Sequence, residues 1–158
     1  MPTIHSKPFN EHMQSELSEI TTAYHAGELS KRELSERPDD IHIIKEDGQM
    51  VGYGVIWEYN SGKQLIQKAE KDYFSADEKY LEKDFYIEIK NQSDYIFIEA
   101  LDVLKEFERK GYAAFFVNWL KEKYPNKTMF VYTLDKTRNF WYKQGFQALG
   151  TTVWMTYR

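Results

Sequence analysis

The chain has 158 residues, a length that suits one domain whose single core buries roughly 70% of the surface that the unfolded chain exposes. Its formal net charge of -4 argues against a nucleic-acid-binding protein that works through a broad basic face. The absence of cysteine excludes a disulfide framework, a thiolate metal site and a cysteine nucleophile. No run of 18 apolar residues occurs, and the first residues lack an apolar signal core, so we expect a cytoplasmic protein with no membrane partner.

The N-terminal segment carries a helical pattern. Apolar residues recur there at steps of three and four, which predicts a helix from about Pro8 to Ala26 with one apolar stripe. Proline is tolerated in the first turn, where its missing N–H would have no partner, and Gly27 ends the helix. A short second helix is predicted over Leu29–Arg37, with Ser30 as a candidate cap and Pro38 after its end. The apolar stripe consists of Phe9, Met13, Leu17, Ile20 and Tyr24.

A β-hairpin follows. Ile41–Lys45 and Met50–Tyr59 are rich in β-forming residues, and the Asp47-Gly48 pair between them is a strong signal for a tight hairpin turn. Gly52 and Gly54 lie inside the second of these strands, and no helix follows them. They therefore indicate a bulge or a close approach of another backbone rather than a nucleotide-binding loop.

The segment between this hairpin and the next predicted strand is harder to interpret. It begins with a turn at Asn60-Ser61-Gly62. Residues Gln64–Lys71 fit either a helix or the return arm of a long hairpin. A helix is predicted over Ala76–Lys83, with Ser75 as its cap, and a strand over Phe85–Lys90.

The central stretch of the chain predicts a strand, a tight loop and an amphipathic helix. The strand is Tyr95–Val103, and Gly111, Ala113 and Ala114 lie where the helix begins. Small residues at a helix start let a ligand approach the backbone, and the N–H groups of the first turn have no intrahelical partner. This arrangement suits an anion such as a pyrophosphate. The apolar residues that predict the helix are Tyr112, Phe115, Phe116, Trp119 and Leu120.

The C-terminal part predicts a buried strand over Thr128–Leu134 and then a helix that carries Phe140 and Trp141. Asp135 is a candidate cap of this helix, and Gly145 is placed as its left-handed terminator. The chain then closes with a hairpin of Phe146–Leu149 and Thr151–Tyr157 across Gly150.

Two motifs resemble the GNAT superfamily of acyl-CoA-dependent N-acyltransferases. The family signature is a Leu-x-Val strand, a short loop and Arg/Gln-x-x-Gly-x-Gly/Ala at a helix start, and this chain has Leu101-Asp102-Val103 and then Glu108-Arg109-Lys110-Gly111-Tyr112-Ala113. Glu108 occupies the position that is usually Arg or Gln. The last helix of the family commonly ends Phe-Tyr-x-x-x-Gly-Phe, and here Phe140 to Phe146 has the same spacing with Trp141 in the place of the tyrosine.

The resemblance covers residues 41–59 and 95–157. It implies a single α/β (α+β) domain over residues 1–158, with a mixed, mostly antiparallel central sheet flanked by helices and an atypical insertion at about 60–94. It also implies transfer of an acetyl group from acetyl-CoA to a primary amine of a small molecule or peptide, without a metal. The residues that it assigns to acetyl-CoA are Leu101, Asp102, Val103, Glu108, Arg109, Lys110, Gly111, Tyr112, Ala113, Ala114, Phe140, Trp141 and Lys143.

The reaction needs a base and an acid. An alkylamine with a pKa near 10.4 is protonated at neutral pH, and exposing its lone pair costs about 4.6 kcal/mol. The resemblance makes Glu99 the candidate base, because family members frequently place a glutamate on this strand; an edge position or a salt bridge is its alternative role. An indole N–H cannot supply a proton in this pH range, so Trp141 cannot protonate the leaving thiolate. The proton must come from Tyr142, from another tyrosine or from water.

Two other kinds of protein remain open. Because of Glu108 and Trp141, a catalytically weak acyl-CoA-binding sensor is one alternative, and an interaction module that uses the same fold is another. The four histidines lack metal-ligand spacing, so no metal site is expected. The acceptor and the oligomeric state are not readable, although Glu58, Glu70, Asp72 and Glu88 suggest a cationic amine. The aromatic residues that either line an acceptor pocket or pack against the sheet are Tyr73, Phe74, Tyr80, Phe85 and Tyr86.

Overall fold

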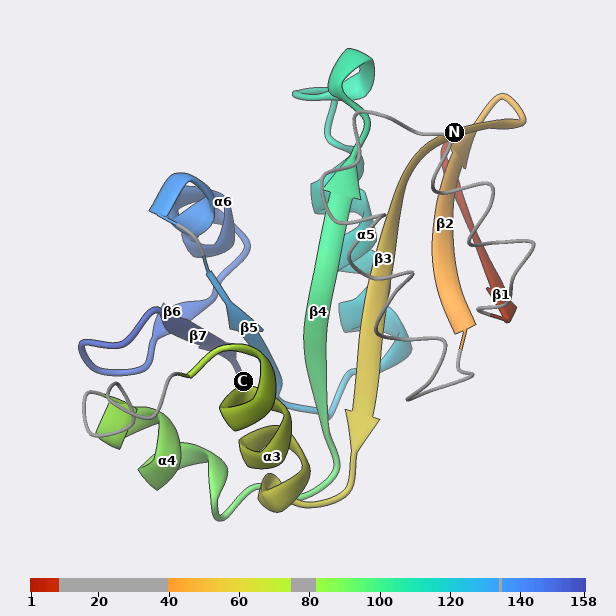
Figure 1. Cartoon of the computed structure of the whole chain (residues 1–158). Helices are drawn as coiled ribbons and strands as arrows, with labels where there is room; N and C mark the ends of the chain where they lie inside the picture. Colours follow the sequence, from red (N-terminus) through yellow and green to blue (C-terminus); the bar gives the residue numbers. More distant parts are fainter. Residues whose placement is uncertain (9–39, 75–81, 134) are drawn as a thin grey trace. The chain divides into compact units, whose positions relative to one another are not determined.

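The computed structural model describes residues 1–8, 40–74, 82–133 and 135–158. The chain divides into two compact units, of which unit 1 comprises Met1–Ile56 and Ala100–Lys123, and unit 2 comprises Trp57–Glu99 and Tyr124–Arg158. Seven strands form a mixed, mostly antiparallel sheet in the order β1-β2-β3-β4-β5-β7-β6 (Figure 1), and the expected fold class is confirmed. In the described part of the chain, no helix is long and apolar enough to cross a membrane.

Unit 1 contains the predicted hairpin. Strands β2 (Asp40–Glu46) and β3 (Gln49–Tyr59) pair antiparallel, and Asp47 and Gly48 between them have φ angles of 51° and 75°. Positive φ at both turn positions is the geometry that an Asp-Gly pair favours in a two-residue hairpin, so this prediction is confirmed.

Strand β1 (Thr3–Pro8) was not expected from the sequence. It pairs antiparallel with β2, with Thr3 opposite Lys45 and Pro8 opposite Asp40. Pro8 is therefore the last residue of a strand, a position that proline tolerates at the end of an outer strand. The remainder of the predicted helix to Ala26, and the short helix predicted over Leu29–Arg37, lie outside the described residues.

The two glycines of β3 allow other parts of unit 1 to come close. A Cβ atom on Gly52 would lie 2.6 Å from the carbonyl oxygen of Asp102 on β4 (Tyr95–Val103). A Cβ on Gly54 would lie 2.6 Å from Cε1 of Phe116 on α5 (Tyr112–Lys123). Both distances are shorter than a real Cβ contact. The predicted close approach of another backbone is confirmed at Gly52, whereas the neighbour of Gly54 is the side chain of Phe116. The core of this unit contains Ile41, Ile43, Tyr53, Val55, Ala100 and Leu104.

Unit 2 contains the parallel part of the sheet. β4 pairs in parallel with β5 (Met129–Tyr132), in a register that runs from Ile96 opposite Met129 to Ile98 opposite Val131. β5 pairs antiparallel with β7 (Trp154–Tyr157), which pairs with the short β6 (Gln147–Ala148). The predicted central strand and closing hairpin are therefore confirmed, although the strands of the hairpin are shorter than expected.

The segment between β3 and β4 is helical where it is described. Residues Gly62–Asp72 form α3, so the helix and not the hairpin arm is correct for Gln64–Lys71. Residues Lys83–Ile89 form α4, and the strand predicted over Phe85–Lys90 is wrong. Of the helix predicted over Ala76–Lys83 with its Ser75 cap, all but the last two residues lie outside the described part of the chain.

The aromatic residues of this segment pack into the core of unit 2. Phe74 and Phe85 are buried, and both contact the fully buried Trp154 of β7, at ring-centroid distances of 6.1 and 4.3 Å. Tyr73 stacks on Tyr132 of β5 at 4.5 Å. For these rings the structure favours packing against the sheet over the lining of a pocket, and Tyr80 is not among the described residues.

The last helix, α6 (Arg138–Lys143), follows a short 3-10 turn, η3 (Asp135–Thr137). Thr137 is the N-cap of α6, so the expectation that Asp135 would cap this helix is wrong. Gly145 has a φ of 91°, and backbone bonds run from Gly145 N to Tyr142 O (3.0 Å) and from Phe146 N to Trp141 O (3.0 Å). These bonds define a Schellman motif, which confirms the predicted glycine terminator.

Candidate active site

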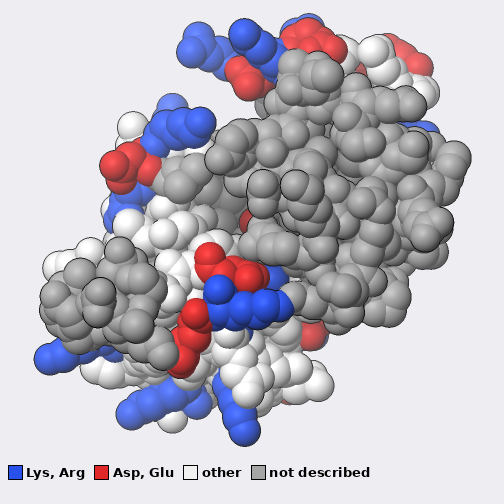
Figure 2. Space-filling view, in the orientation of Figure 1, with Lys and Arg blue, Asp and Glu red and all other residues white. Residues whose placement is uncertain are grey.

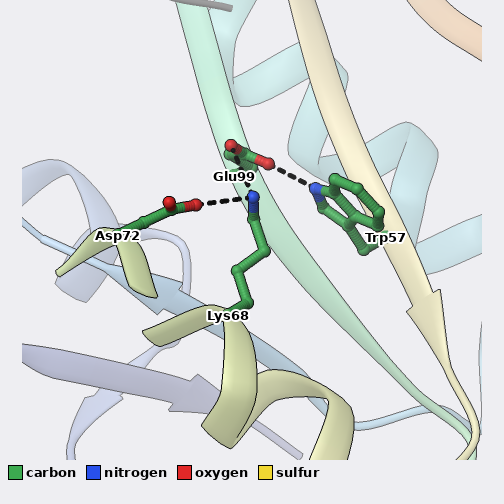
Figure 3. Close-up of polar contacts among 4 residues, drawn as sticks. All are labelled: Trp57, Lys68, Asp72 and Glu99. Atoms are coloured by element: carbon green, nitrogen blue, oxygen red, sulfur yellow. Dashed lines mark hydrogen bonds and ion pairs between the residues drawn. The ribbon is translucent and has the colours of Figure 1, made fainter. Parts of the chain in front are cut away.

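Glu99 lies in a buried polar cluster of unit 2. Its Oε2 accepts a hydrogen bond from the indole Nε1 of Trp57, and its Oε1 lies 3.2 Å from Nζ of Lys68 (Figure 3). The same Nζ donates to Asp72 Oδ2 at 2.8 Å and lies 4.7 Å from the centre of the Trp57 ring. The side chains of Lys68, Asp72 and Glu99 are 5%, 5% and 2% exposed. We refer to these four residues as the Glu99 cluster.

The cluster follows from how β4 and α3 are anchored. Glu99 comes directly after Ile98, the last β4 residue in the parallel register with β5. The hydroxyl of Tyr95, on the same strand, donates to the carbonyl of Ser61 at the start of α3 (2.9 Å). The Gln64 side chain then accepts bonds from the backbone N–H groups of Asn60 (2.7 Å) and Ser61 (3.1 Å), which satisfies donors that a helix start leaves without intrahelical partners.

Sequence reasoning found Glu99 but missed Lys68, Trp57 and Asp72 as its surroundings. A signal for Lys68 was present, because Leu65, Lys68 and Ala69 fall on one face of α3 and all three are buried. A lysine on the apolar face of a helix needs an acidic partner, and Asp72 follows it at the i,i+4 spacing. The contact with Glu99 joins residues 31 positions apart, which a single sequence does not reveal.

The predicted anion-binding loop lies in unit 1. Leu104 N donates to Val51 O (2.8 Å), which ties the end of β4 to β3, and a 3-10 turn, η2 (Lys105–Phe107), follows. Arg109 and Gly111 then have φ angles of 63° and 87°. A Cβ on Gly111 would meet no atom of the described residues within 4 Å, so these residues leave open space at this position.

Helix α5 starts at this loop. Phe115 N donates to Gly111 O (2.9 Å), which makes Gly111 the residue that precedes the helix. The N–H groups of Gly111, Tyr112, Ala113 and Ala114 consequently have no intrahelical acceptor. The residues of the loop fit a pyrophosphate on two grounds, which are these backbone donors and the open space at Gly111.

The charges around this loop have both signs. Glu108, Arg109 and Lys110 are all exposed, and Lys110 Nζ lies 5.5 Å from the centre of the Phe107 ring. Desolvation, and then the carboxylates of Glu46 and Asp47, raise the pKa of the Tyr112 hydroxyl, so this side chain is neutral at physiological pH. Of the other predicted binding residues, Leu101, Asp102 and Val103 are half-buried at the end of β4.

The residues predicted on α6 have different environments. Trp141 is buried, with ring-centroid distances of 5.0 Å to Phe140 and 4.9 Å to Phe146, whereas Lys143 is exposed. Tyr142 is 47% exposed, and its hydroxyl accepts a hydrogen bond from Arg138 Nη2 (3.3 Å), one turn earlier on the helix. Trp141, at the position of the family tyrosine, therefore packs in the core, and Tyr142 points away from the core.

The acidic residues that suggested a cationic acceptor are engaged within the chain. Asp72 pairs with Lys68, Glu58 lies 3.4 Å from Lys127, and Glu88 pairs with Arg158. Glu70 contributes to the raised pKa of Tyr86, after burial. On the face shown in Figure 2, acidic and basic side chains of the described residues are interspersed. These residues consequently give no reason to prefer a polyamine over another amine.

Residues 5–146 match the profile of the Acetyltransferase (GNAT) family. The chain belongs to this family. A curated relative, an uncharacterized N-acetyltransferase of Staphylococcus epidermidis, is 29% identical over 121 residues, which are 71% of this chain and 73% of the relative.

Solved GNAT structures share the fold. The N-acetyltransferase YlbP of Bacillus subtilis, crystallised in complex with coenzyme A, superimposes with a TM-score of 0.61 at 15% identity. The superposition covers 100% of this chain and 97% of the YlbP chain. A GNAT family acetyltransferase of Brucella melitensis, crystallised with acetyl-CoA, gives a TM-score of 0.54 at 12% identity over 98% of this chain and 87% of its own. No group of three or more potential metal ligands occurs among the described residues of the present GNAT chain.

Proposed function

We propose that the protein transfers an acetyl group from acetyl-CoA to a primary amine of a small molecule or peptide, with Glu99 as the general base. The observation that carries this proposal is the buried carboxylate of Glu99, placed on the strand that continues into the Gly111 loop. The acetyltransferase family of the chain supports the reaction class.

The Gly111 loop is the proposed site for the pyrophosphate of acetyl-CoA. The backbone donors of Tyr112, Ala113 and Ala114 favour negative charge together with the positive end of the α5 dipole. Arg109 and Lys110 add positive side chains at the same loop. Glu108 is exposed, so its carboxylate remains solvated and its repulsion of the phosphates is screened.

Glu99 is the proposed proton acceptor for the amine. Its Oε2 already accepts the Trp57 indole N–H, whereas Oε1 accepts no hydrogen bond from the described residues. A buried carboxylate oxygen with unused lone pairs takes a proton from an ammonium group directly or through water. When bound, acetyl-CoA supplies the activated thioester; the backbone N–H of Val103 is the proposed oxyanion donor, and Tyr142 is the proposed acid for the leaving thiolate.

A second candidate function is that of an acyl-CoA-binding protein without turnover. Trp141 favours it, because this residue replaces the family tyrosine and its side chain is packed between Phe140 and Phe146. Both candidates bind acetyl-CoA, so only release of coenzyme A in the presence of a panel of amines separates them.

The first experiment is a thermal unfolding measurement with and without acetyl-CoA. At about 100 times the dissociation constant, ligand binding adds about 2.7 kcal/mol to the free energy of unfolding. For a chain of this size the midpoint should rise by about 5–10 °C. Replacing Gly111 by Val should abolish this rise, because its side chain fills the open space where the phosphates approach the backbone.

Gly48→Val is the matched control. Gly48 also has a positive φ, of 75°, and its Cβ would also meet no atom within 4 Å in the described part of the chain. The backbone strain of the two variants is therefore similar, but only Gly111 lies at the proposed site. No rise for the wild-type protein at millimolar acetyl-CoA, or an equal rise for both variants, would contradict the proposed donor site.

A further inference from the structure

Lys68 is a buried primary amine in direct contact with the proposed base. Its Nζ lies 3.2 Å from Glu99 Oε1, and its side chain is 5% exposed (Figure 3). A general base must lie within about 2.6–3.2 Å of the atom whose proton it takes, and this pair meets that requirement. Among the described residues, Lys68 carries the one ammonium group that the structure places at Glu99.

The surroundings of Lys68 hold this amine in place. Its Nζ donates a hydrogen bond to Asp72 Oδ2 at 2.8 Å and lies 4.7 Å from the centre of the Trp57 ring. Leu65 and Ala69, on the same face of α3, are fully buried and belong to the core of unit 2. An amine that is already fixed beside its base loses little further freedom when it reacts, which favours it over an amine that must be bound from solution.

We propose that Lys68 is an acetylation site, modified by the acetyl-CoA that the same chain binds. This inference rests on the proposed function. Any amine that Glu99 deprotonates for transfer must lie next to the thioester, and Lys68 already lies at Glu99. Unlike a free acceptor, this lysine reacts once, so each chain takes up one acetyl group there.

The step balances in atoms and charge. Glu99 takes a proton from the Lys68 ammonium group, and the neutral amine attacks the carbonyl carbon of the thioester. A C–N bond forms and the C–S bond breaks. The leaving thiolate takes a proton from the proposed acid, Tyr142, and the second proton of the nitrogen restores that hydroxyl through solvent. The product amide is neutral, so the positive charge between two buried carboxylates is lost and the acetylated fraction should unfold at a lower temperature.

The test is peptide mass spectrometry of the full chain after incubation with acetyl-CoA at neutral pH. Lys63 and Lys71 are exposed lysines of the same helix, and they report the uncatalysed reaction with the thioester. Lys68 should be acetylated at least about tenfold faster than either, although it is buried. Dilution of the protein should not change the acetylation rate of Lys68, because the reaction occurs within one chain. In urea, where α3 is unfolded, the three lysines should react at similar rates.

Glu99→Gln tests whether the reaction depends on the proposed base. The acetylation rate of Lys68 should fall by about 10²-fold or more, while Asp72 still pairs with the ammonium group. Glu58→Gln is the matched control, because Glu58 is a half-exposed carboxylate that pairs with Lys127. This control should leave the acetylation rate of Lys68 unchanged.

Two results would overturn the inference, which are acetylation of Lys68 no faster than that of Lys63, and an unchanged rate at Lys68 in Glu99→Gln. If Glu99→Gln does not fold, the comparison of the lysines in the wild-type protein decides alone. Failure of the proposed function is recognised separately, as a wild-type protein whose thermal midpoint does not respond to acetyl-CoA. A protein that responds, and releases coenzyme A with an added amine while Lys68 stays unmodified, contradicts this inference alone.

Discussion

Glu99→Gln removes one negative charge from the Glu99 cluster and changes the side-chain volume very little. Lys68 keeps Asp72 as a partner at 2.8 Å, so the variant should fold. Loss of a general base typically lowers turnover by about 10²–10⁴-fold. We therefore expect kcat to fall by that factor while the dissociation constant of acetyl-CoA, measured by calorimetry, remains within a factor of two.

Glu58→Gln is the matched control for this substitution. Glu58 is a half-exposed carboxylate of β3 that pairs with Lys127, and exposed ion pairs contribute little. Its turnover should equal that of the wild-type protein. Full turnover of Glu99→Gln would remove Glu99 from the mechanism and leave it a structural member of an ion-pair cluster.

Tyr142 is tested by removal of its hydroxyl alone. If this hydroxyl protonates the leaving thiolate, Tyr142→Phe should lower kcat by about tenfold or more without a change in acetyl-CoA affinity. The side chain is 47% exposed, so the loss of its bond to Arg138 should have little effect on the thermal midpoint. An unchanged kcat would assign the proton to water or to another tyrosine.

At the scale of the element, the contact between β3 and α5 is tight enough to be measured. A Cβ at Gly54 would overlap with the ring of the fully buried Phe116. Gly54→Ala should therefore lower the free energy of unfolding by about 1–3 kcal/mol in urea denaturation, as overpacking does in other cores.

A double-mutant cycle identifies the cause of that loss. Phe116→Leu removes the ring atoms that the new methyl group would meet, so the double variant should be more stable than the sum of the two single losses predicts. Strict additivity would show that Gly54→Ala acts through the strand backbone and not through α5.

The elements that were predicted correctly depend on local chemistry, whereas the strand predicted over Phe85–Lys90, which is a helix in the structure, depends on distant contacts. Asp47-Gly48 and Gly145 adopt positive φ angles that their own residue types favour. In α4, Phe85, Ile87 and Ile89 alternate with Tyr86 and Glu88, a pattern that also fits a strand. The structure instead buries Phe85 and Ile89, four residues apart, and leaves Ile87 59% exposed. The core of unit 2 selects the helical period, and the sequence alone does not show that core.

The same reasoning applies to the candidate site. The Gly111 loop is contiguous in sequence, so its motif could be recognised, and Glu99 was found because it precedes that motif on one strand. Trp57, Lys68 and Asp72 reach Glu99 only after β3, α3 and β4 have come together within unit 2. Three of the four acidic residues that suggested a cationic acceptor, Glu58, Asp72 and Glu88, form ion pairs within the chain, so they do not identify the acceptor.

At the scale of the whole molecule, two buried tyrosines couple stability to alkaline pH. Burial, and then the charge of Asp102, raise the pKa of Tyr53, and burial raises that of Tyr95. Because both folded pKa values exceed the unfolded value of about 10, this stability is fully present below pH 10 and is lost as the pH rises further. Urea denaturation should show a loss of up to about 1.4 kcal/mol per pH unit for each tyrosine.

The two phenylalanine variants should differ at neutral pH. The Tyr53 hydroxyl has no hydrogen-bond partner among the described residues, so Tyr53→Phe should leave the stability at pH 7 unchanged or raise it. Tyr95→Phe loses the hydrogen bond to Ser61 and should lower the free energy of unfolding at pH 7 by about 1 kcal/mol. Each substitution should reduce the slope of the free energy of unfolding against pH, above pH 10, by the contribution of one proton. An unaltered slope would show that the loss of stability at alkaline pH has another origin.

The hydrogen bond between Trp57 and Glu99 also gives the molecule an optical reporter. The chain has four tryptophans, and Trp57 is the one whose indole N–H is bonded to the proposed base. The emission of an indole depends on the polarity and charge around its ring, so any event that withdraws or neutralises Glu99 changes the Trp57 signal. The difference in fluorescence between the wild-type protein and Trp57→Phe thus reports on the surroundings of Trp57, which include the Glu99 carboxylate and the Lys68 ammonium group, without a label and before any acceptor has been identified.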